Sequence, residues 1–205
     1  GCGVGGGSLI FANTLLVPPS NVFKDSRWPS DDDWEAKLAP HYATAKRMLG
    51  AVEAKNVCET DELLRSVVDD DLGAGQCSFR KHTVSVFYGD APGKTVSDPY
   101  FSGEGPDRAG CIHCGECMTG CKHNAKNTLD KNYLYLAEAR GATVVPETRV
   151  TDIRPIDGGY ELTWEESTRR FGKKRGVYRA KGVVVAASVM GTVELLLKCR
   201  EKGSL

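Results

Sequence analysis

Four of the eight cysteines in this chain of 205 residues lie within one stretch of eleven residues. The four are Cys111, Cys114, Cys117 and Cys121, and their spacing is C-x2-C-x2-C-x3-C. In a secreted chain of under about 100 residues, eight cysteines would indicate a disulfide framework. This chain is longer and its thiols are clustered, so the pattern favours a bound metal or cluster in a reducing cytoplasm.

The spacing is that of bacterial ferredoxins, in which a tight loop presents thiolates to a 4Fe–4S cluster. Gly115 and Gly120 would help such a loop to turn. In two-cluster ferredoxins the fourth cysteine precedes a proline and serves the other cluster, whereas Cys121 precedes a lysine and the motif occurs once. A single cluster would therefore use Cys121 with changed geometry, or recruit Cys58 or Cys77.

Zinc is the alternative metal, because it accepts four thiolates in a tetrahedron and C-x2-C pairs are common zinc ligands. In zinc sites two such pairs are usually separated by a longer segment of chain, whereas here Cys114 and Cys117 are only three residues apart. His113 and His123 would then be further candidate ligands. Reduced thiols or disulfides without a metal are the third alternative.

The charges of the chain balance, with 27 basic and 27 acidic side chains. A dedicated nucleic-acid or membrane-surface binder would need a basic excess, so we expect no nucleic-acid partner. No apolar run reaches the roughly 18 residues that a membrane-spanning helix requires, so we expect no integral membrane segment. Length and composition fit one domain of ordinary size or two small ones.

Five of the first seven residues are glycine, and residues 1–6 satisfy the pattern G-x-G-x-x-G. The dinucleotide fingerprint also needs a strand before the glycines, a helix after them and an acid about 20 residues on. The segment 8–17 is apolar and predicts extended chain instead, so we reject that interpretation. Close approach of the backbone to a flat or anionic ligand would explain the glycines. A flexible terminus is the alternative.

Hydrophobic periodicity predicts alternating helices and strands, hence a mixed α/β (α+β) fold. Pro40 is expected to break or restart the first helix, and residues 89–110 are expected to form a long loop. The continuous apolar run 183–185 suggests a strand buried on both faces. The expected helices cover about 34–52, 60–73, 129–140 and 191–202, and the expected strands cover 83–88, 142–146, 149–156, 160–164 and 183–185.

Three blocks of the sequence, in the same order, resemble the glucose-methanol-choline (GMC) FAD-dependent oxidoreductases, in particular the cholesterol oxidase-like branch. The first block is Gly3–Leu9 (GVGGGSL), followed by Asn13 and Pro18, and resembles the flavin-facing loop. The second, Asn124–Leu134, resembles the helix that leads to the adenine side. The third, Val183–Leu197, resembles a late strand and helix of the dinucleotide domain.

The resemblance implies FAD as the cofactor and part of a FAD-binding dinucleotide fold, with a helix-and-sheet substrate lobe. Residues 186–188 stand where the family usually has a Gly-Ala-Gly-like turn, so a side chain occupies a position of expected close approach. The residues implied to contact FAD are Gly3, Val4, Gly5, Gly6, Gly7, Ser8, Asn13, Val150 and Ala187.

The resemblance also suggests a division of the chain into three parts. Residues 1–18 would be the flavin-facing loop and strand, 19–128 a substrate lobe of helices and loops with the cysteine cluster, and 129–205 the helix, strands and hairpin of the FAD domain. Residues 1–18 and about 142–205 should lie together. The chain would be an internal fragment, inactive alone, and none of its histidines is assigned as a catalytic residue.

Two functions compete. The first is an oxidoreductase that passes hydride from a small alcohol or sterol to flavin, with electrons leaving through a possible iron–sulfur cluster to an acceptor protein. The second is a stand-alone iron–sulfur or zinc-binding module without catalysis.

Overall fold

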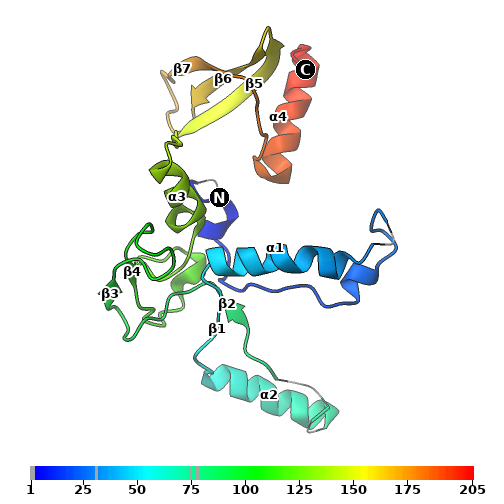
Figure 1. Cartoon of the computed structure of the whole chain (residues 1–205), viewed down its shortest axis with the longest axis vertical. Helices are drawn as coiled ribbons and strands as arrows, with labels where there is room; N and C mark the ends of the chain where they lie inside the picture. Colours follow the sequence, from blue (N-terminus) through cyan, green and yellow to red (C-terminus); the bar gives the residue numbers. More distant parts are fainter. Residues whose placement is uncertain (1–2, 31, 74, 77–78) are drawn as a thin grey trace. The chain divides into compact units, whose positions relative to one another are not determined.

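The computed structural model describes residues 3–30, 32–73, 75–76 and 79–205 (Figure 1). The chain forms two compact units, residues 1–143 (unit 1) and 144–205 (unit 2). The three-part division expected from the sequence follows function rather than compactness and stays a prediction. No helix among the described residues is both long and apolar enough to cross a membrane.

Two long helices of unit 1 begin at side chains that cap them. In α1 (Trp34–Met48) the Asp33 carboxylate accepts the N–H of Ala36 at 2.9 Å, and α2 (Glu59–Leu72) begins with a capping box in which the carboxylate of Asp61 accepts the N–H of Cys58. Both helices were expected. The expected break at Pro40 is wrong, because a proline removes only one backbone donor and the turns on either side keep their hydrogen bonds.

The strands of unit 1 are short. The pair β1 (Val52–Glu53) and β2 (Thr83–Val84) and the pair β3 (Thr95–Val96) and β4 (Arg108–Ala109) are both antiparallel. The strand expected over 83–88 is thus regular only in its first two residues, and its continuation pairs Val86 with Lys126 as an isolated bridge. The expected loop 89–110 contains β3 and β4, which bring the chain to the start of the cysteine loop.

The centre of unit 1 is polar. Arg108 is 1% exposed and donates from its guanidinium to the carbonyl oxygens of Asn124 and Lys126 and to Oδ1 of Asn127. The amide of Asn127 in turn donates to the Tyr100 hydroxyl at 3.1 Å. Buried polar groups must be paired in this way, and the pairing fixes the backbone on both sides of residues 124–127.

The last helix of unit 1 follows this polar centre. A short 3-10 helix, η4 (Leu129–Lys131), leads into α3 (Tyr133–Ala139). The buried side chain of Asn132 accepts the N–H of Tyr133 and donates to the carbonyl oxygen of Thr128 at 3.1 Å. The helix expected here is confirmed, and a 3-10 turn forms its start.

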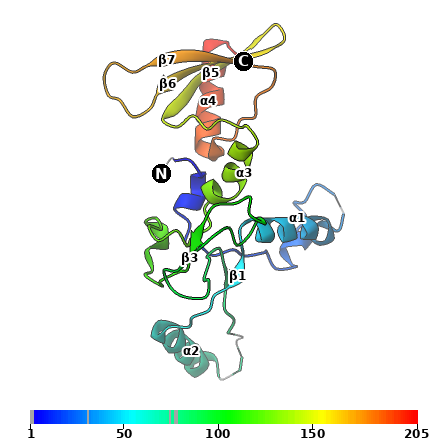
Figure 2. The same cartoon turned by 60° about the vertical axis from the view of Figure 1, so that its left-hand side comes forward.

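Unit 2 is a three-stranded antiparallel sheet with one helix. The strands β5 (Thr148–Ile156), β6 (Gly159–Glu166) and β7 (Arg175–Ala180) lie in this order. Helix α4 (Ser188–Lys202) lies along β5 in both views (Figures 1 and 2). Its buried Cys199 accepts the backbone N–H of Ile153 at 3.4 Å, which fixes the helix on the strand.

Two strands expected from the sequence do not form among the described residues. Residues 142–146 and 183–185 form no strand, and Val184 is 91% exposed. A strand buried on both faces needs partner strands and covering layers, and no described residue pairs with this run. The mixed helix-and-sheet class expected from the sequence is nevertheless confirmed.

Candidate functional site

The glycine-rich start of the chain forms a tight turn. Gly5 (φ 105°) and Gly6 (φ 55°) adopt left-handed conformations, and the 3-10 helix η1 (Gly6–Leu9) follows. The expectation of extended chain from Ser8 onward is therefore wrong for this first turn, because two left-handed glycines turn the backbone. A Cβ built on Gly6 or Gly7 would meet no atom within 4 Å, so this face of the loop is open.

Ser8 ties this loop to the segment that precedes α3. Its hydroxyl donates to the carbonyl oxygen of Gly5 at 2.6 Å and accepts the N–H of Leu129 at 2.9 Å. The preceding residues also pack on the loop: a Cβ on Gly3 would lie 2.7 Å from the Leu9 side chain, while Val4 is 40% exposed. The first and second sequence blocks therefore meet in the structure.

Asn13 lies between the glycine-rich turn and the cysteine loop. It is 5% exposed and has a left-handed backbone (φ 75°). Its carbonyl oxygen accepts the N–H of Ser85 at 2.9 Å, and its Nδ2 donates to Sγ of Cys117 at 3.7 Å. Its Oδ1 is buried without a hydrogen-bond partner. A buried acceptor without a partner is costly, so this atom marks a place where a ligand could supply a donor.

Lys126 bridges the two loops from the other side. Its side chain is fully buried, and Nζ donates to the carbonyl oxygens of Leu9 at 3.1 Å and Cys117 at 2.8 Å. Nζ also lies 4.6 Å from the ring centroid of Phe11. Burial lowers the pKa of Lys126, while the nearby thiol groups of Cys117 and Cys121 oppose that shift. Sequence reasoning missed this residue, because a lysine in a polar segment normally indicates a solvated side chain.

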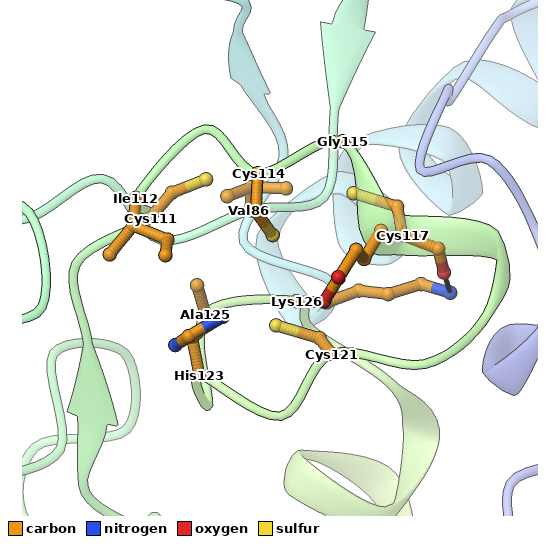
Figure 3. Close-up of a pocket in the computed structure, with 11 residues that line it drawn as sticks. Val86, Cys111, Ile112, Cys114, Gly115, Cys117, Cys121, His123, Ala125 and Lys126 are labelled. Atoms are coloured by element: carbon orange, nitrogen blue, oxygen red, sulfur yellow. Dashed lines mark hydrogen bonds between the residues drawn. The ribbon is translucent and has the colours of Figure 1, made fainter.

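The four clustered cysteines line one small pocket that is partly open to solvent (Figure 3). The loop that carries them turns at Gly115 (φ 75°) and Gly120 (φ 108°), as the sequence predicted. His113 also adopts a left-handed backbone (φ 61°). Its N–H donates to Sγ of Cys111 at 3.3 Å, so the tight turn directs a backbone donor toward a sulfur.

The pKa values of two of these thiols shift in opposite directions. Burial raises the pKa of Cys117, and the neighbouring cysteines add to that effect. Burial also acts to raise the pKa of Cys121, but backbone N–H groups, foremost that of Lys126, stabilise its thiolate and lower the pKa overall. The pocket thus stabilises negative charge at Cys121 more than at Cys117.

A second set of metal-binding atoms overlaps this pocket. Single ligand atoms of Cys114, Glu116 and His123 lie within 4.8 Å of one another. Glu116 was not predicted from the sequence, although its position between two cysteines is the signal that could have found it. Cys58, considered as a replacement ligand, caps α2 and does not line the pocket. Cys77 lies outside the described residues.

The histidine beside the first cysteines has partners of its own. His113 stacks on Tyr88 with ring centroids 5.6 Å apart, and its Nδ1 lies 3.1 Å from Nδ2 of Asn56. These contacts hold the ring outside the pocket, which His123 lines instead. Of the two histidines considered as zinc ligands, the structure therefore brings only His123 to the cysteines.

The two expected FAD contacts of unit 2 are Val150 and Ala187. Val150 lies in β5 opposite Trp164, next to an irregularity in strand register. Ala187 precedes α4 and donates its N–H to the Thr192 hydroxyl at 3.2 Å. Ser188 adopts a left-handed backbone (φ 59°), the conformation expected where a glycine usually stands. Their roles toward FAD, and the expected proximity to residues 1–18, stay predictions.

Comparison with known proteins identifies the family. Residues 104–199 match the family model of the GMC oxidoreductases, and the whole chain is 46% identical to a cholesterol oxidase of Acinetobacter baumannii. The chain belongs to the GMC oxidoreductase family. It is also 46% identical to cholesterol oxidases of two Mycobacterium tuberculosis strains. It spans 38% of the length of the Acinetobacter protein and 36% of the mycobacterial ones.

The match to GMC oxidoreductases includes the cysteine loop, the segment before α3 and most of unit 2. The resemblance expected from the three sequence blocks is therefore confirmed. The alternative of a stand-alone metal-binding module is not favoured, because similarity to cholesterol oxidases extends over the whole chain.

Proposed function

We propose that this chain forms part of an FAD-dependent oxidoreductase that oxidises the hydroxyl group of an alcohol or sterol-like substrate, with sterols as the favoured class. The observation that carries the proposal is the direct contact between the glycine-rich turn and the segment before α3, made through Ser8 and Lys126. Both segments resemble parts of the flavin site in this family. The similarity to proteins named cholesterol oxidase supports the substrate class.

The residues present fit a flat cofactor such as FAD. The open face at Gly6 and Gly7 leaves the backbone accessible to an aromatic ring system, and the unpaired Oδ1 of Asn13 lacks a hydrogen-bond donor. When bound, FAD would accept hydride from the alcohol carbon. In this proposal Gly3–Gly7 line the ring, and Ser8 holds their turn in place.

The more distant part of the cofactor is assigned to unit 2. We propose that the backbone at Val150 holds the adenine and that Ala187 lies beside the cofactor at the start of α4. The left-handed Ser188 supports this assignment, because it reproduces a glycine-like turn. Only backbone atoms would then need to approach the cofactor.

Oxidation of an alcohol also needs a base within about 3 Å of the hydroxyl proton. The four histidines of this chain occupy no catalytic motif of the family, and His113 is engaged with Tyr88 and Asn56. We therefore assign binding and positioning, and no proton transfer, to these 205 residues. We expect them alone to bind FAD weakly and to oxidise no alcohol.

A reduced flavin would have to pass its two electrons to an acceptor before the next turnover. A one-electron centre on the cysteine loop would favour a dehydrogenase that passes them to an acceptor protein, rather than an oxidase that passes them to oxygen. The six described cysteines are free thiols, which supports a reducing, cytoplasmic location.

The test is turnover by the natural polypeptide that carries these residues. Anaerobically purified protein should bleach its flavin absorbance when cholesterol is added, and an artificial electron acceptor should restore it. Faster recovery with that acceptor than with oxygen would support the dehydrogenase. Absence of flavin, or flavin that no sterol or simple alcohol reduces, would overturn the proposal.

A further inference from the structure

Two buried cations of unit 1 lack an ion-pair partner among the described residues. Lys126 is 0% exposed and Arg108 is 1% exposed, and the candidate acidic partner is Asp130, which lies within electrostatic range of Arg108 without a hydrogen bond to it. Their hydrogen bonds go to neutral acceptors, namely backbone carbonyls and the amide oxygen of Asn127. Buried charges are costly without a counter-charge, so an anion is expected close by.

Two thiols and one carboxylate can supply negative charge near these cations. Asp130 and Cys121 lie within electrostatic range of Arg108, whereas the groups within range of Lys126 are the thiols of Cys117 and Cys121. A thiol that binds a metal does so as a thiolate, which carries the required charge. The two cations therefore indicate that the cysteine loop is anionic in the working protein.

Two sulfurs of the loop also receive hydrogen bonds. The amide of Asn13 donates to Sγ of Cys117 at 3.7 Å, and the N–H of His113 donates to Sγ of Cys111 at 3.3 Å. A neutral thiol is only a weak acceptor, so donors directed at sulfur suit a ligated thiolate. Hydrogen bonds to the sulfurs are also one of the means by which proteins tune iron–sulfur clusters.

We propose that the cysteine loop binds one 4Fe–4S cluster through Cys111, Cys114, Cys117 and Cys121, and that Lys126 and Arg108 neutralise its negative charge. A cubic cluster with four thiolates carries a net charge of about −2 in its oxidised form, which two buried cations balance. The four thiols release their protons as they become ligands. This cofactor is distinct from FAD, and its presence can be measured whether or not FAD binds.

A single zinc ion fits these observations less well. Four thiolates around zinc lie about 3.8 Å apart, given Zn–S bonds of about 2.3 Å. The one set of three ligand atoms within 4.8 Å among the described residues is that of Cys114, Glu116 and His123. An ion held there would be neutralised by its own ligands and would leave Lys126 without a counter-charge from a thiolate of Cys117 or Cys121. It would also leave the two hydrogen-bonded sulfurs unused.

The first experiment measures iron and acid-labile sulfide in the natural polypeptide purified without oxygen. We expect about four of each per chain, with loss of both in the double variant Cys111→Ser, Cys114→Ser. Cys58→Ser is the matched control, because Cys58 is an exposed thiol that does not line the pocket. Circular dichroism should show the same fold in all three proteins.

The second experiment measures the midpoint potential of the cluster. Lys126→Met should lower it, because a positive charge that stabilises the added electron is removed, while Lys46→Met on exposed α1 should leave it unchanged. If Lys126→Met does not fold, Arg108→Gln tests the same charge effect. Zinc as the sole metal, no metal, or iron that the double cysteine variant retains would overturn the cluster. An unshifted potential would overturn the role of the cations.

Discussion

The ammonium group of Lys126 donates to the carbonyl oxygen of Leu9 at 3.1 Å, across 117 positions of the sequence. The same group donates to the carbonyl oxygen of Cys117 at 2.8 Å. One buried side chain thus fixes the glycine-rich turn and the cysteine loop to each other. Because both loops bond to this one side chain, a displacement of one loop would also displace the other. The proposed flavin-facing surface and the proposed cluster site therefore both depend on the position of Lys126.

Ser8→Ala should loosen the glycine-rich turn. The hydroxyl links Gly5 to Leu129, and its loss leaves a backbone donor and an acceptor without this partner. We expect a loss of about 1 kcal/mol in the free energy of unfolding. Urea unfolding is the measurement. Ser66→Ala is the control, because the Ser66 hydroxyl bonds only within the exposed helix α2, and an equal loss there would contradict the structural role of Ser8.

Arg108→Leu should destabilise unit 1 strongly. The substitution leaves the carbonyl oxygens of Asn124 and Lys126 and the amide oxygen of Asn127 without their buried donors. We expect a loss on the order of 3 kcal/mol in urea unfolding. Arg140→Leu breaks an exposed ion pair with Glu104 and an exposed hydrogen bond to the carbonyl oxygen of Leu136, and should cost under about 1 kcal/mol. Similar losses of unfolding free energy in the two variants would show that the polar centre around Arg108 does not stabilise unit 1.

The stability of unit 2 should depend on pH through Glu161. This side chain is 5% exposed and pairs with Arg154 and Arg179, and their hydrogen bonds hold its pKa below the ordinary value of 4.5. A lowered folded-state pKa gives stabilisation that is present above pH 4.5 and is lost as pH falls through the lowered value. Glu161→Gln should therefore lower the melting temperature at pH 7.

The difference between Glu161→Gln and the parent should shrink as the pH falls below 4.5 and the parent carboxylate becomes protonated. Thermal unfolding followed by circular dichroism at several pH values measures this. Glu201→Gln, at an exposed position of α4, serves as the control. A constant difference between parent and Glu161→Gln at all pH values would contradict the ion-pair explanation.

The sequence predicted the local features of this protein well. The turns at Gly115 and Gly120, the helix after Asp33 and the existence of a helix from about Thr60 follow from rules that act within a few residues, although that second helix is capped at Cys58. The four-cysteine spacing likewise predicted that these side chains would line one pocket, because the short turns between them keep the four residues close together.

Features that depend on distant partners were not predictable in this way. The polar centre around Arg108 and Lys126 is invisible to hydrophobic periodicity, which treats both residues as solvated. The run Val183–Val185 was interpreted as a buried strand, but strand formation depends on neighbouring strands that no short apolar run specifies. Pro40 shows the same limit, since one lost hydrogen bond is offset by the rest of the helix.

Gly7 offers the most direct test of the flavin-facing assignment. A Cβ at Gly7 would meet no protein atom within 4 Å, and its backbone does not require glycine. Gly7→Leu should therefore leave the fold stable while filling the space that the cofactor is proposed to use. Ala43→Leu adds similar bulk to an exposed position of α1 and serves as the matched control.

The deciding measurement is the dissociation constant of FAD, determined by flavin fluorescence in the natural polypeptide and these two variants. We predict binding at least about tenfold weaker in Gly7→Leu and unchanged binding in Ala43→Leu, a difference of about 1.4 kcal/mol. Equal FAD affinity in all three proteins would contradict the claim that the glycine-rich turn faces the flavin.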